Sequence, residues 1–170
     1  MLLQQKLGNI SSLSTDSSIN DLAIDNLSLE WYETDKRILH AKTEAGTQVT
    51  LKFLDRNPDF KDGDIVWKDE NKMIVVDLKR CECIVIKSRS VLEAAAICYE
   101  IGNRHLPLFY EENQLLTPYD APLFGLLQAK GYELKIEERK LSNRFRTTVM
   151  PHIQVSEAVS SLISATKIQR

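Results

Sequence analysis

Hydrophobic and polar residues alternate along the first half of the chain in the manner of half-buried strands. The apolar positions that share a face are Leu27, Leu29 and Trp31 in one segment and Val49, Leu51 and Phe53 in another. Ala45-Gly46-Thr47 lies between these segments and predicts a hairpin turn. With further strands near residues 65–67 and 73–76, the pattern predicts a small all-β N-terminal domain, which we place at residues 1–77.

The pattern changes after the charged residues 77–80, where helical spacing begins to alternate with strand spacing. The expected order is strand, helix, strand, strand, helix, strand, with the strands near residues 81–85, 106–110, 115–117 and 132–136. This order is that of the split βαβ, or ferredoxin-like, arrangement. We therefore expect an α+β chain with a ferredoxin-like (βαββαβ) domain at residues 78–150.

The first predicted helix has clear signals at both ends. Ser90 and Glu93 form the pattern of a capping box at its start, and Gly102 is suited to the left-handed conformation that ends a helix. The predicted buried face of this helix comprises Val91, Ala94 or Ala95, Cys98 and Ile101. This reading places His105 at the joint between the helix and the strand 106–110.

The last segment, residues 151–170, begins with Pro151-His152 and contains no turn-forming residues. Its apolar residues Val155, Val159, Leu162 and Ile163 fall at helical spacing. Such a tail is either flexible or a helix that docks elsewhere, and the sequence leaves both readings open.

Composition narrows the classes of function. The 22 Lys and Arg residues nearly balance the 24 Asp and Glu residues, which argues against a nucleic-acid or anionic-lipid surface. The start of the chain has no pattern of an export signal, no segment is apolar enough to span a membrane, and the three cysteines are an odd number, so we expect a cytoplasmic protein with reduced thiols. Phosphate-loop, dinucleotide-binding and nucleophile-elbow motifs are also missing, so an enzyme is not expected.

The candidate chemistry lies in the histidines. Imidazole binds divalent nickel, zinc and copper, but one side chain cannot hold a metal alone, and His105 could equally be an idle group at a helix end. His40 lies on a predicted strand and is interpreted as structural. Cys81 and Cys83 could form a soft-metal pair, but their spacing of two beside an apolar strand favours packing, as we expect for Cys98.

The run Ile101-Gly102-Asn103-Arg104-His105, after an alanine-rich helix, resembles the signature of the UreE family of urease accessory proteins, which are nickel metallochaperones. The resemblance extends from about Cys81 to Met150 and, more loosely, to the strand-rich first half. It implies a homodimer in which His105 of both subunits binds one nickel ion at the two-fold axis, with His152 as a further ligand. A two-fold axis duplicates any ligand that lies beside it.

The resemblance also implies partners: the urease accessory GTPase UreG and, finally, apo-urease. Zinc and copper are expected to compete for an imidazole site. The chain lacks the histidine-rich C-terminal run that is frequent in the family, so nickel storage is not expected. The alternative from another class is a noncatalytic peptide- or protein-binding module of two domains without a specific metal role.

Overall fold

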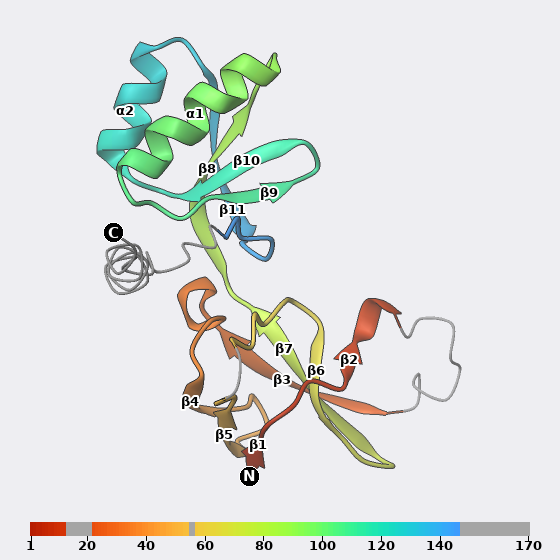
Figure 1. Ribbon diagram of the computed structural model, residues 1–170. Helices are drawn as coiled ribbons and strands as arrows, with labels where there is room; N and C mark the ends of the chain where they lie inside the picture. The colour runs from red at the N-terminus through yellow and green to blue at the C-terminus, as the bar shows by residue number, and fades with distance from the viewer. Residues whose placement is uncertain (13–21, 55–56, 147–170) are drawn as a thin grey trace, which may run out of the picture.

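The computed structural model describes residues 1–12, 22–54 and 57–146. They form two units, one at each end of the molecule, and the strands β7 and β8 run from one unit into the other (Figure 1). The proposed ligand His152 and the possible C-terminal helix lie outside the described residues.

The N-terminal unit is built almost entirely from strands. Its elements are β1 (Leu2–Leu3), β2 (Gly8–Asn9), the 3-10 turn Ile10–Ser12, β3 (Ala23–Leu29), the 3-10 turn Trp31–Glu33, β4 (Ile38–Lys42), β5 (Gln48–Lys52), β6 (Asp64–Lys68) and β7 (Lys72–Leu78). They form a three-stranded sheet in the order β1-β5-β4 and a four-stranded sheet in the order β2-β6-β7-β3. The expected sheet-rich N-terminal region is thus confirmed.

The predicted strand faces are correct except at one residue. Leu27 and Leu29 are fully buried, and Val49, Leu51 and Phe53 lie in the same core cluster. Trp31, which was expected to extend the first strand, instead begins a 3-10 turn. The Glu33 side chain accepts from the Glu30 N–H at 3.1 Å, and the Glu33 N–H donates to the Glu30 carbonyl at 2.9 Å, so the chain turns here and does not continue β3.

A buried carboxylate stabilises the N-terminal unit. Asp25 is 3% exposed and accepts hydrogen bonds from the Thr43 hydroxyl (2.7 Å) and the Ala45 N–H (2.9 Å), and its Oδ2 lies 2.6 Å from Lys72 Nζ. Burial alone raises the pKa of Asp25, but these three partners together outweigh burial and hold that pKa below its ordinary value of 3.8. The ionised form is therefore favoured by folding.

We expect Asp25→Asn to lower the free energy of unfolding by about 2 kcal/mol at neutral pH, because the variant loses an ion pair and weakens two hydrogen bonds. The pKa of Asp25 is lower in the folded chain than in the unfolded chain, so the carboxylate's contribution is present above pH 3.8 and is lost as the pH falls further. Urea denaturation of both proteins between pH 7 and pH 3 measures how the difference between their free energies of unfolding shrinks as the pH falls. Glu70→Gln, at an exposed turn residue, is the matched control.

The C-terminal unit combines one sheet with two helices. Its elements are β8 (Arg80–Lys87), α1 (Val91–Asn103), β9 (Phe109–Glu111), β10 (Gln114–Pro118), α2 (Ala121–Ala129) and β11 (Glu133–Lys140). The strands form one antiparallel sheet in the order β11-β8-β10-β9, and both helices lie on the same side of it (Figure 1). The expected α+β character of this region is confirmed.

The buried face of α1 differs in part from the prediction. Ile97 and Ile101 are fully buried against the sheet, Ala94 and Cys98 pack beside them, and Val91 is 88% exposed. At 100° per residue, Val91 lies about 120° around the helix from Ile97, which turns it away from the sheet. Including Val91 in the buried face was therefore wrong.

Aromatic packing and ion pairs hold the two units together. Trp31 packs on the face of the C-terminal sheet that carries Cys83 and Val85, and its ring forms an edge-to-face pair with that of Phe109, with 5.8 Å between centroids. Only Lys79 separates β7 from β8. Lys140 Nζ, at the end of β11, lies 2.9 Å from an Asp62 oxygen and 2.7 Å from an Asp77 oxygen.

Candidate metal site

His105 lies in the capping motif that ends α1. Its N–H donates to the Gly102 carbonyl at 2.9 Å, and the Leu106 N–H donates to the Ile101 carbonyl at 3.3 Å. This pair of bonds defines a Schellman motif, in which the residue after the C-cap adopts the left-handed conformation. Here that residue is His105, with a φ of 56°.

The end of α2 has the same motif, with glycine, the usual residue, in the left-handed position. Gly131 donates to the Gln128 carbonyl, Tyr132 donates to the Leu127 carbonyl, and the φ of Gly131 is 77°. A left-handed conformation costs a residue with a Cβ about 1–2 kcal/mol, and glycine avoids this cost. At α1 the chain has histidine where α2 has glycine.

Two expectations about this joint are wrong. Gly102 is the penultimate residue of the helix and not its left-handed end, because the helix continues through Asn103. His105 is not at the entry of a strand, since β9 begins only at Phe109.

The capping box predicted at the start of α1 is only half formed. The side chain of Ser90 does cap the helix start, whereas Glu93 accepts from the Arg89 N–H and not from that of Ser90.

The cap leaves His105 exposed at the end of an exposed apolar stripe. Leu92 is 81% exposed and Tyr99 is 68% exposed, Ala95 is exposed between them, and the polar residue Asn103 follows beyond Tyr99. These positions follow one another at helical spacing on the side of α1 opposite Ile97. This stripe was not predicted from the sequence, although the apolar residues Leu92, Ala95 and Tyr99, three and four positions apart on the side of the helix away from its buried face, were a signal for it.

The other candidate ligands do not converge on His105. His40 is exposed on β4 in the N-terminal unit, where its Nδ1 lies 3.0 Å from the Thr50 hydroxyl. Across residues 1–12, 22–54 and 57–146, no group of three or more His, Cys, Asp or Glu side chains is placed to hold a metal ion. A site at His105 therefore needs ligands from beyond the described part of one chain.

The cysteines are packed as expected. Cys83 is fully buried, donates to the Glu137 carbonyl at 3.2 Å, and shares one face of β8 with Cys81. Burial raises the pKa of Cys83 to about 12 and raises the pKa of Cys81 and of Cys98 above the ordinary value. Thiolates are the metal-binding form, so these thiols are poorly suited to metal capture at neutral pH.

Comparison with known proteins decides the family. Residues 3–79 match the model of the N-terminal domain of the UreE urease accessory protein, and residues 81–150 match the model of its C-terminal domain. The chain belongs to the UreE family. It is 38% identical over 146 residues to the urease accessory protein UreE of Flavobacterium johnsoniae, covering 86% of this chain and 88% of that protein.

Other UreE proteins match over similar lengths. UreE of Helicobacter pylori is 37% identical over 164 residues, which cover 94% of each chain, and UreE of Actinobacillus pleuropneumoniae is 34% identical over 145 residues, which cover 85% of this chain and 78% of that one. Membership in the UreE family assigns the chain to urease maturation as an accessory protein and not as an enzyme. In the described residues, no helix is both long and apolar enough to cross a membrane.

Proposed function

We propose that this UreE family member is a nickel carrier in which His105 of two subunits holds one nickel ion across a two-fold axis. The observation that carries the proposal is the conformation of His105. A fixed left-handed cap holds an exposed imidazole at the end of the helix, at a position where α2 uses glycine. Costly backbone conformations of this kind are often retained at functional sites.

The apolar stripe of α1 is the proposed dimer surface. Leu92 and Tyr99 are too exposed to contribute to the core of one subunit, and they lie on the helix that ends at His105. An isologous contact through this stripe would bring both copies of His105 toward the axis, which supplies two ligands from one residue per chain. Desolvated aromatic residues are also common anchors of such interfaces.

The remaining parts of the proposal rest on the family. His152, outside the described residues, is a proposed further ligand, while UreG and apo-urease are the proposed partners in the cytoplasm. Zinc and copper are proposed competitors, because imidazole accepts all three metals. We propose the boundaries 1–77, 78–150 and 151–170 for the partner-binding domain, the metal domain and the tail. We also propose ferredoxin-like topology for the metal domain, supported by the strand order β11-β8-β10-β9.

A site of this kind suits delivery better than storage. Few protein ligands and an exposed position favour exchange, whereas structural sites are closed by four ligands. The alternative, a noncatalytic peptide- or protein-binding module without a specific metal role, predicts that His105 is dispensable for urease maturation.

Urease activation under limiting nickel separates these readings. In cells that make urease and lack their own UreE, we expect the wild-type chain to restore urease activity and His105→Ala to fail, with excess nickel restoring activity to both. His40→Ala, which removes an exposed histidine of the other unit, should behave as wild type. Full activation by His105→Ala at limiting nickel would favour the noncatalytic module.

A further inference from the structure

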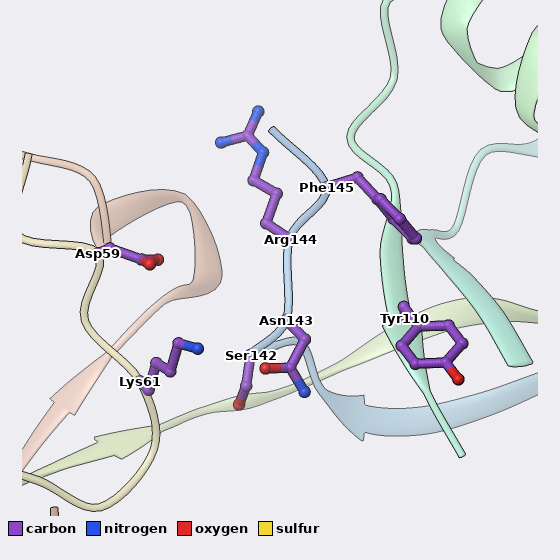
Figure 2. A pocket seen from close by; sticks show the side chains of 7 residues that line it. All are labelled: Asp59, Lys61, Tyr110, Ser142, Asn143, Arg144 and Phe145. Carbon is purple, nitrogen blue, oxygen red and sulfur yellow. The ribbon is translucent and has the colours of Figure 1, made fainter. Parts of the chain in front are cut away.

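A pocket of about 220 Å³ lies where the two units meet, away from the proposed metal site. Its lining comes from both units: Asp59 and Lys61 from the N-terminal unit, and Tyr110, Ser142, Asn143, Arg144 and Phe145 from the C-terminal unit. In Figure 2, Lys61 extends toward the segment that carries Ser142 and Asn143, and the two aromatic rings stand on the far side of that segment.

The backbone of the C-terminal wall is held in place. The Tyr110 N–H donates to the Asn143 carbonyl at 2.9 Å, the Phe145 N–H donates to the Leu108 carbonyl at 2.7 Å, and Phe109 and Arg144 form an isolated β-bridge. The segment 143–145 therefore continues the sheet beyond β9. The pocket wall is preformed and does not need to be ordered by a ligand.

The charges around the pocket leave one cation unpaired. Arg144 is paired with Asp35 at 3.0 Å, and Asp59 is paired with Arg146 at 2.6 Å. Within the part of the chain that the structure describes, the Lys61 ammonium makes no ion pair or hydrogen bond, whereas the Lys61 backbone N–H donates to the Asp64 carboxylate at 2.9 Å. The charge left for a ligand is thus a single positive one, which matches a monoanion better than a phosphate dianion.

Neutral donors accompany the cation. The side chains of Ser142 and Asn143 also make no hydrogen bond to the described residues, and both line the pocket with Lys61. An ammonium, a hydroxyl and an amide are a suitable donor set for a carboxylate, which accepts several hydrogen bonds through two oxygens. A neutral ligand would leave the charge uncompensated.

Next to these donors is an exposed aromatic surface. Tyr110 is 44% exposed and Phe145 is 53% exposed, and their rings form an edge-to-face pair at 6.1 Å. The pocket volume is below the roughly 300–1,000 Å³ of common small-molecule sites, so it fits the end of a larger ligand. Exposed aromatic residues beside a polar pocket are typical of protein interfaces.

We propose that this pocket binds a carboxylate of a polypeptide, with an apolar neighbour of that carboxylate packing on Tyr110 and Phe145. Because its lining comes from both units, an occupied pocket would bridge them. A free organic acid carries the same carboxylate and is the other possible source. The proposal is independent of the nickel site.

The test is a titration of the ¹⁵N-labelled full chain followed by NMR. The probe is N-acetyl-Phe-Glu-amide, and the matched probe without the charge is N-acetyl-Phe-Gln-amide. We expect the first to shift the amide signals of Lys61, Tyr110 and Phe145 and the second to bind about tenfold more weakly, since a hydrogen bond to a charged group is worth about 1.5–3 kcal/mol. Lys61→Met should weaken binding of the acidic probe by about the same factor.

Lys68→Met is the matched control, because Lys68 is an exposed lysine at the end of β6 that does not line the pocket. Equal binding of the two probes, or unchanged binding by Lys61→Met in a folded variant, would overturn the proposal. Sodium acetate tests the other source: binding of acetate as tight as that of the acidic peptide would assign the site to free carboxylates and overturn the polypeptide assignment.

Discussion

Replacing His105 by glycine is expected to abolish tight nickel binding and at the same time to stabilise the fold. The imidazole is the proposed ligand, so its removal from both subunits empties the site. The left-handed conformation that His105 adopts favours glycine, so His105→Gly should raise the free energy of unfolding by about 1 kcal/mol. Calorimetric titration with nickel and urea denaturation measure the two effects separately.

Two further variants isolate the two effects of this substitution. His105→Asn keeps a residue that tolerates the left-handed conformation and should lose nickel while leaving stability nearly unchanged. Gly131→Ala at the equivalent cap of α2 should destabilise by about 1 kcal/mol and leave nickel binding intact, because an added Cβ there meets nothing within 4 Å and the cost is conformational. Nickel binding by His105→Gly at wild-type affinity would exclude His105 as the anchor.

The second large effect is expected at the apolar stripe of α1. The double variant Leu92→Glu with Tyr99→Glu should be monomeric, because it places charges on the proposed dimer surface. Nickel affinity should fall by about a hundredfold, since the second His105 is no longer held at a high effective concentration. Sedimentation and calorimetry on the same samples check both results.

The exposure of both side chains makes this experiment interpretable. Leu92 and Tyr99 lie outside the core clusters, so the double variant should stay folded and unfold cooperatively on heating. Ile24→Glu places one such charge on an exposed residue of the N-terminal unit and should leave the dimer and the nickel affinity unchanged. A dimeric double variant with unchanged nickel affinity would place the interface elsewhere.

Much of the fold could be predicted from the sequence because it follows local rules. Alternation identified the buried faces at Leu27 and Leu51, and turn residues marked the hairpin at Gly46 correctly. Trp31 was misplaced because the pattern of apolar residues cannot show that β3 ends at Leu29 and that Glu30 and Glu33 bond to each other in the turn that follows. Its ring packs against Phe109 of the other unit, and the local pattern of residues does not predict a contact between residues so distant in sequence.

The sequence pointed to His105 as the candidate ligand but did not reveal the backbone geometry around it. The motif from Ile101 to His105 pointed to the histidine, yet propensity assigned the left-handed position to Gly102. The actual choice depends on where the last backbone hydrogen bonds form, and these place His105 after the cap. The pocket at Lys61 could not be predicted at all, because its walls are distant in sequence and meet only when the two units pack.

Native mass spectrometry of the wild-type chain with limiting nickel tests the central claim most directly. If one nickel ion is shared by two copies of His105, the spectrum should show a dimer carrying one nickel and a monomer carrying none, and the His105→Gly dimer should carry none. A monomer that retains nickel, or a dimer that loads two ions with equal affinity, would contradict a shared site on the two-fold axis.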